Sequence, residues 1–167
     1  MILPNNYFAL CCTFTILYIL LFSGTLHGQE LSSPLPQIKV ISKFGYRIHP
    51  IYKIPKFHNG VDLYARGDTV KNILHGLVVE TGFHNELGYY LRSMHGKIEI
   101  LYAHLSSINA LPNDSIYAGD YIGISGSTGI TTGEHLHLSV KIKGKYIDPL
   151  KFLKVLFHQF TKQNNKP

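Results

Sequence analysis

The order of apolar and polar residues divides this chain into a leader, a short linker and a folding domain. Residues 7–22 are almost wholly apolar, and small or polar residues follow them up to Gly28. A secretory signal peptide has such a run followed by a small residue at its cleavage site. We therefore expect residues 1–28 to be a signal peptide. The alternative is an uncleaved membrane anchor, although a spanning helix usually needs about 20 apolar residues.

Beyond a linker with prolines and serines at residues 29–37, short apolar runs alternate with glycine-containing turns. Ile98, Ile100 and Tyr102 alternate with a second set of side chains, which is the period of a partly buried strand. The pattern predicts strands at residues 39–43, 76–81, 89–94, 97–104, 120–125 and 135–142.

One late segment has the pattern of a helix. Asp148 can cap its start, and Pro149 takes the first helical position. Many short strands and one late helix predict a mostly β domain, built on an antiparallel sheet with one C-terminal helix. We place this domain at residues 38–160, before a polar tail at residues 161–167. The expected apolar side of the helix consists of Leu150, Leu153, Val155, Leu156 and Phe160.

The leader and the expected mature domain differ in cysteine content and in charge. Cys11 and Cys12 both lie in the apolar run, so the expected mature domain has no disulfide and no thiolate metal ligand. The net charge is +6, and residues 1–28 contain no charged side chain. A basic exported domain suits an anionic partner such as a wall polymer or a membrane surface, although ordinary solvated lysines are the alternative. No nucleic-acid-binding motif is present, so we expect no nucleic acid partner.

Two histidines separated by one residue, His135 and His137, lie in one predicted strand. A chain with ten histidines in 167 residues contains about 0.6 such patterns by chance, so the pattern alone means little. In a strand, however, residues i and i+2 project from the same face. Both imidazoles would then point into one cleft, about 7 Å apart along the strand. Leu136 and Leu138 would face the core behind them, and Glu134 would also point away from the cleft.

A second pattern joins His58 and Asp62, four residues apart. Asn59-Gly60 between them favours a turn over a helix, and the simplest interpretation is a hairpin turn with an incidental histidine. His104 ends an apolar strand, where a lone histidine is usually packed or solvated. Together, however, the H-x-x-x-D, Y-A-H and H-x-H segments can supply three zinc ligands and two further imidazoles. Catalytic zinc uses three protein ligands and keeps its fourth position for water.

Other catalytic motifs are missing from the sequence. The glycine-rich residues 123–133 lack the Gly-Lys-Ser/Thr ending of a P-loop, so we expect no nucleotide binding. No G-x-S-x-G elbow accompanies the serines, and the H-E-x-x-H motif of helical zinc proteases is absent. The histidine motifs are therefore the candidate catalytic and metal-binding residues of this chain.

Several longer segments reinforce the histidine patterns. They are SKFGYRIHP at residues 42–50, KFHNGVDLYA at 56–65, ILYAHLSS at 100–107, GDYIGISGSTGITTGEHLHLSV at 119–140 and the closing DPLKFL. In this order and at these approximate spacings, residues 39–153 resemble the lysostaphin/LytM-type peptidases, peptidase family M23. The resemblance implies a β-sheet domain with a narrow groove, one zinc ion per chain and cleavage of peptide bonds in peptidoglycan.

The same resemblance implies roles for the five residues. His58, Asp62 and His137 would be the zinc ligands, and His104 and His135 the catalytic pair. The implied protein is a zinc-dependent endopeptidase that acts on peptidoglycan cross-links or stem peptides. It would be exported to the periplasm or cell envelope, and a retained leader would associate it with the membrane. The alternative is a non-catalytic module that binds the wall or activates another hydrolase, but such a module is expected to lack at least one of the five residues.

Overall fold

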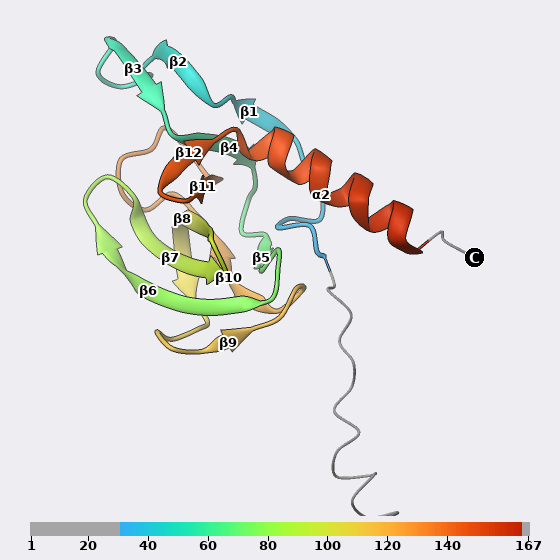
Figure 1. Ribbon diagram of the computed structural model, residues 1–167. Coiled ribbons are helices and arrows are strands. Elements are labelled where there is room, and N and C mark those ends of the chain that lie inside the picture. Colours follow the sequence, from blue (N-terminus) through green and yellow to red (C-terminus); the bar gives the residue numbers. More distant parts are fainter. Residues whose placement is uncertain (1–30, 165–167) are drawn as a thin grey trace, which may run out of the picture.

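Antiparallel strands form most of the described part of the chain, and helix α2 follows them at its C-terminal end (Figure 1). The computed structural model describes residues 31–164, so the expected signal peptide lies outside the described residues. The elements are β1 (Val40–Ser42), β2 (Gly45–Ile48), β3 (Pro55–His58), β4 (Gly60–Tyr64), β5 (Thr69–Lys71), β6 (Gly76–His84), β7 (Gly88–His95), β8 (Ile98–Ile108), β9 (Ser115–Ile116), β10 (Tyr121–Ser125), β11 (His135–Ile142), β12 (Lys145–Ile147) and α2 (Pro149–Asn164).

Ten of these strands belong to one sheet, in which β1, β4, β11, β8, β7, β6 and β9 follow one another. β10 pairs with β5 and β8, and β12 pairs with β11. β2 and β3 pair only with each other and form the β2–β3 ribbon, residues 45–58. Every pair of named strands is antiparallel, so the fold class predicted from the sequence is confirmed.

The six predicted strands are present as β1, β6, β7, β8, β10 and β11, while the remaining, mostly shorter strands were not predicted. β4 shows why, because its residues Gly60 to Leu63 are all buried and leave no alternation to detect. β8 is also buried on both faces, from Ile100 to Leu105, whereas the sequence predicted a partly buried strand. Leu101 and His104 of this strand line the groove described below.

One face of the central strands packs into the core, and the other carries the candidate site. Leu136 and Leu138 of β11 are fully buried and belong to the same core cluster as Tyr102 of β8. His135 and His137 project from the opposite face of β11 into a groove. The predicted orientation of this strand is therefore confirmed.

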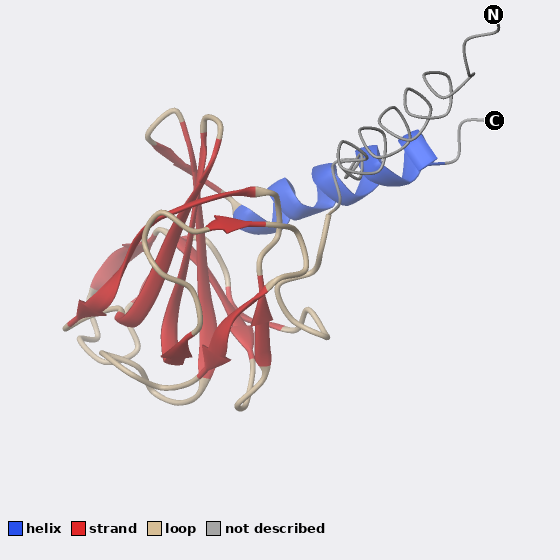
Figure 2. Ribbon diagram, turned by 90° about the horizontal axis from the view of Figure 1, so that it is seen from below, coloured by secondary structure: helices blue, strands red, loops and turns tan. Residues whose placement is uncertain are grey.

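Helix α2 begins where the sequence predicts it. The backbone N–H of Leu150 donates to Asp148 Oδ1 at 3.0 Å, so Asp148 caps the helix. The prediction was right for Leu153, which is buried, and wrong for Val155, which is 55% exposed, while Phe152 was not expected on the buried side. The helix projects beyond the edge of the sheet (Figure 2). Within residues 31–164, no helix is both long enough and apolar enough to cross a membrane.

Part of the segment expected as a linker packs on the domain. The N–H of Ser32 donates to the carbonyl of Ile73 at 3.0 Å, and the N–H of Lys71 donates to the carbonyl of Pro34 at 3.1 Å. Leu35 is 2% exposed and belongs to the core. The end of the linker therefore contributes to the packing of the domain, while the domain limits stay a prediction.

Candidate metal centre and its groove

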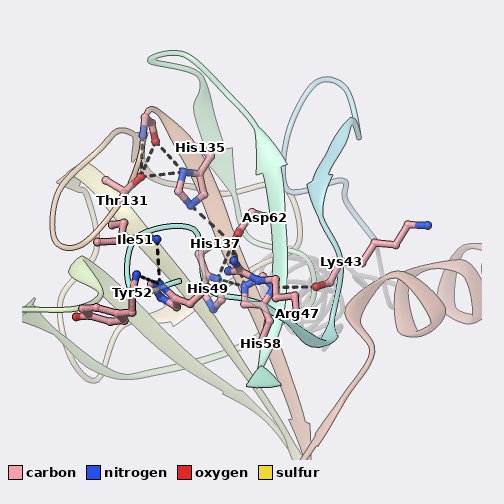
Figure 3. Close-up of polar contacts among 11 residues, drawn as sticks. Lys43, Arg47, His49, Ile51, Tyr52, His58, Asp62, Thr131, His135 and His137 are labelled. Atoms are coloured by element: carbon pink, nitrogen blue, oxygen red, sulfur yellow. Dashed lines mark hydrogen bonds and ion pairs between the residues drawn. The ribbon is translucent and has the colours of Figure 1, made fainter. Parts of the chain in front are cut away.

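Three donor atoms from separate strands converge on the groove face of the sheet. His58 ends β3, and His137 of β11 lies directly opposite Asp62 of β4. His58 Nε2 is 3.1 Å from Asp62 Oδ1, and His137 Nδ1 is 2.8 Å from the same oxygen (Figure 3). The two nitrogens are 3.1 Å apart. Within the described part of the chain, this is the only group of three or more His, Cys, Asp or Glu placed to hold a metal ion.

The chemistry of these donors fits a small divalent cation. Burial would raise the pKa of the Asp62 carboxyl, but its contacts with His137 and His58 hold that pKa well below its usual range. Burial lowers the pKa of His137, so at neutral pH this ring is neutral. A carboxylate and neutral imidazoles are zinc ligands, and atoms about 2.0–2.1 Å from a tetrahedral zinc lie about 3.3–3.4 Å from one another. The three separations in this group, 2.8, 3.1 and 3.1 Å, are shorter by about 0.2–0.6 Å.

A main-chain contact orients the His58 ring. Its Nδ1–H donates to the Lys43 carbonyl at 2.9 Å, so Nε2 is the ring nitrogen that faces the donor group. Metal-binding histidines commonly bond through their other nitrogen in this way. The hairpin turn suggested by Asn59-Gly60 is not formed, because β3 and β4 pair with different strands. The chain instead passes from one strand directly into the next.

Gly60 leaves space for the His137 ring. A Cβ added to Gly60 would lie 2.7 and 2.8 Å from two atoms of that ring, and it would also overlap the carbonyl oxygen of Leu138. Any side chain at this position would therefore displace the ring or the strand behind it. This close approach explains a glycine between His58 and Asp62.

Arg47 contacts the second oxygen of the Asp62 carboxylate. Its Nη2 is 3.5 Å from Asp62 Oδ2, while Oδ1 faces the histidines. Groups that contact a ligand from outside orient it and tune its affinity for the metal. The sequence offers no local sign of this contact, because it depends on the β2–β3 ribbon, which was not predicted.

His104 lies at a β-bulge in β8 and has a left-handed backbone conformation, with φ 59°. Bulges re-aim side chains and are frequent beside active sites. The Nδ1–H of His104 donates to the Thr128 carbonyl at 2.8 Å. Burial lowers the pKa of His104 to about 4, against the raising effect of that carbonyl. The ring is therefore neutral at neutral pH and can accept a proton.

His135 begins β11 and is held by the loop of residues 126–134 that precedes it. Its Nδ1–H donates to the Gly133 carbonyl at 2.7 Å, and Thr131 Oγ1 lies 3.2 Å from the same nitrogen (Figure 3). Its Nε2 is 3.7 Å from Asp62 Oδ1, and its ring centroid is 4.7 Å from that of His104. The structure thus brings together all five residues that the sequence singled out.

These five residues line a groove of about 230 Å³. The β2–β3 ribbon forms one side, and the turn between β6 and β7 and the 126–134 loop contribute the rest of the rim. Lys56 Nζ and Glu86 Oε1, 3.6 Å apart, join the ribbon to the β6–β7 turn. Glu134 is exposed and does not line the groove, in agreement with its predicted direction.

Comparisons with known proteins agree with this geometry. Over 119 residues the chain is 35% identical to the DD-carboxypeptidase/endopeptidase Mpg of Neisseria meningitidis, covering 70% of this chain and 27% of that protein. It is 34% identical over 114 residues to the peptidoglycan DD-endopeptidase ShyA of Vibrio cholerae, covering 63% of this chain and 25% of that protein. The chain therefore spans about a quarter of the length of these curated relatives.

The fold has a close counterpart among solved structures. The catalytic domain of the antimicrobial peptidase lysostaphin from Staphylococcus simulans superposes with a TM-score of 0.65 and 33% identity, covering 70% of this chain and 92% of that one. The sequence model of peptidase family M23 matches residues 56–149, which is more than half of the chain and includes all five site residues. The chain belongs to peptidase family M23.

Proposed function

We propose that this protein is a zinc-dependent endopeptidase that hydrolyses peptide bonds in the cross-links or stem peptides of peptidoglycan. The observation that carries the proposal is the convergence of three metal donors and two further imidazoles in one groove. Family membership supports a metallopeptidase, and the names of the relatives support peptidoglycan as the substrate.

His58, Asp62 and His137 would hold one zinc ion per chain. When bound, the ion supplies Lewis acidity toward a water molecule and the scissile carbonyl. Arg47 keeps the Asp62 carboxylate in position through Oδ2, and the Lys43 carbonyl keeps His58 Nε2 directed at the donor group. The ligand set leaves room for a further, non-protein ligand, as catalytic zinc sites require.

His104 and His135 carry out the proton transfers in this proposal. Because Nδ1 of each ring is bonded to a main-chain carbonyl, Nε2 is the atom available for exchange. The pair accepts a proton from the attacking water and returns one to the leaving amine. A protonated imidazole also stabilises the negative charge that develops on the carbonyl oxygen. Such groups typically contribute about 10²–10⁴-fold to the rate.

The second candidate is a non-catalytic module that binds the wall or activates another hydrolase. All five site residues are present, and each of the two imidazoles of the pair is held by its own carbonyl. A binding module has no need for this arrangement. The intact constellation therefore favours catalysis over binding alone.

Digestion of purified peptidoglycan tests the proposal. The zinc-loaded protein should release soluble fragments whose new amino and carboxyl termini are identified by mass spectrometry, and His135→Ala should release far fewer. Equal release by both proteins would reject the assigned chemistry. Retention of the protein on the wall without any new termini would instead establish the binding module.

The proposed substrate places the protein in the cell envelope. The apolar run of residues 7–22 agrees with export, and its cleavage is tested by intact-mass measurement of protein recovered outside the cytoplasm. A chain that begins near Gln29 indicates cleavage. A full-length chain confined to the membrane fraction would mean that the leader is an anchor.

A further inference from the structure

The β2–β3 ribbon and the segment before it expose a large share of the apolar surface. Tyr46 is 85% exposed and Ile48 is 61% exposed, and residues 51–57 are exposed without interruption. Contiguous exposed apolar surface marks a site of interaction rather than an ordinary surface. Eight of the nineteen exposed large apolar side chains of the described residues lie here, namely Ile38, Ile41, Tyr46, Ile48, Ile51, Tyr52, Ile54 and Phe57.

The two faces of the ribbon point to different surroundings. Tyr46 pairs with Phe57 and Arg47 pairs with Lys56 in the register of β2 and β3, and alternate residues project from opposite faces. Arg47 contacts Asp62, so its face is turned to the candidate metal centre. Tyr46 lies on the outer face, where its ring packs edge-on against Phe57 at 5.0 Å. Neither strand pairs with the main sheet, and the ribbon extends from the body of the molecule (Figure 1).

The tip of the ribbon is held in shape by its own hydrogen bonds. The N–H of His49 donates to the Ile54 carbonyl at 2.8 Å, and the N–H of Lys53 donates to the His49 carbonyl at 2.9 Å. The N–H of Tyr52 donates to His49 Nδ1 at 3.2 Å. The apolar tip is therefore preformed, which reduces the entropy lost when it binds a partner.

The ribbon and the segment before it carry only positive charge. Residues 31–61 contain no Asp or Glu but five basic residues, Lys39, Lys43, Arg47, Lys53 and Lys56. Arg47 and Lys56 pair with carboxylates elsewhere in the molecule. Among the described residues, no carboxylate forms a salt bridge with Lys43 or Lys53. Exposed Tyr, Phe and Ile side chains combined with unpaired lysines are the composition of membrane-interface segments.

We propose that the outer face and tip of the β2–β3 ribbon dock on an anionic lipid membrane. Tyr46, Ile48 and Ile54 would enter the boundary between headgroups and acyl chains, and the lysines would contact the anionic headgroups. A soluble polyanion would account for the charge but not for the apolar tip. This docking goes beyond peptidase activity, and it would hold the groove beside the membrane because Ile51 and Tyr52 also line that groove.

A fluorescent reporter tests the proposal in the full chain, which contains no tryptophan. Tyr46→Trp introduces one at the outer face, and Tyr121→Trp introduces a matched reporter on β10, where Tyr121 is 41% exposed. With vesicles of phosphatidylglycerol and phosphatidylcholine, the emission of the first variant should shift to the blue and be quenched by brominated acyl chains. The second variant should show neither change. These readings report the position of the ribbon even if the leader itself enters the bilayer.

Charge variants make the test quantitative. In the Tyr46→Trp chain, Lys43→Gln and Lys53→Gln should each lower the lipid-dependent blue shift at limiting vesicle concentration, corresponding to about fivefold weaker partitioning per lysine. Lys97→Gln and Lys145→Gln, outside the basic segment of residues 31–61, should change it little. The same shift with phosphatidylcholine alone would contradict the anionic preference.

Other occupants of the ribbon would give distinct results. A blue shift without lipid that grows with protein concentration would assign the surface to a second copy of the chain. A shift with soluble peptidoglycan fragments but not with vesicles would assign it to the wall. Unchanged Tyr46→Trp emission on vesicles, or equal quenching of both reporters, would overturn membrane docking.

Discussion

The three candidate metal ligands and the two imidazoles beside them are held by different parts of the molecule. Asp62 and His137 face each other across two paired strands whose other side is core. His104 and His135, in contrast, each donate Nδ1–H to a carbonyl of the glycine-containing 126–134 loop. The placement of Asp62 and His137 therefore depends on strand register, whereas the ring orientation of His104 and His135 depends on one loop. The two properties should be separable by mutation.

Removal of a ligand should have the largest effect. We expect His137→Ala to contain much less than one zinc per chain, because the loss of a group that merely supports a ligand already weakens metal binding about 10–100-fold. Metal analysis after dialysis against limiting zinc measures this, with His135→Ala as the control. Full zinc occupancy in His137→Ala would refute the ligand assignment.

Removal of one imidazole of the pair should leave the metal in place. We expect His135→Ala to retain zinc and lose about 10²–10⁴-fold in turnover, the usual contribution of a general acid or base. Metal content and peptidoglycan turnover are measured on the same preparation. If His135→Ala loses its zinc while His137→Ala retains it, the roles of the two histidines are reversed.

Weakening the loop should have a smaller effect that is confined to the pair. Thr128 Oγ1–H donates to the Leu105 carbonyl at 2.6 Å and accepts from the Tyr89 N–H at 3.0 Å. Thr128→Val removes both bonds, which should lower stability by about 1–3 kcal/mol. Turnover should fall because the Thr128 carbonyl orients His104, while zinc content should not change.

A matched substitution elsewhere controls for the loss of a hydroxyl. Thr161 Oγ1–H donates to the Phe157 carbonyl on the exposed helix α2 at 2.8 Å. Thr161→Val should therefore leave turnover unchanged. A loss of zinc in Thr128→Val would show that the loop and the strands are not independent supports.

The same difference explains what the sequence could predict. The H-x-H histidines share a face because a strand alternates, and alternation can be recognised from sequence. The opposition of Asp62 and His137 depends on β4, which is buried throughout from Gly60 to Leu63 and has no visible period. Their grouping with His58 was therefore predicted through the family resemblance rather than from local pattern.

The supports of the site were not predictable from local pattern. His104 is placed by a bulge and a left-handed φ, which depend on the pairing of β7 with β8. The Arg47 contact with Asp62 depends on the β2–β3 ribbon, whose pairing no local pattern predicted. The expectation that Val155 lies on the buried side of the helix was wrong for a simpler reason. The helix buries the side that carries Phe152 and Leu153, so Val155 faces solvent.

A substitution next to the pair should have the smallest effect of all. Glu134 immediately precedes His135, yet it is exposed and does not line the groove. We expect Glu134→Ala to keep its zinc and to change stability by no more than about 0.5 kcal/mol, as surface substitutions usually do. Turnover should stay close to that of the unmodified protein, because only His104 and His135 exchange protons in the proposed mechanism. A loss of turnover as large as that of His135→Ala, with zinc retained, would contradict the assignment of proton transfer to His104 and His135 alone.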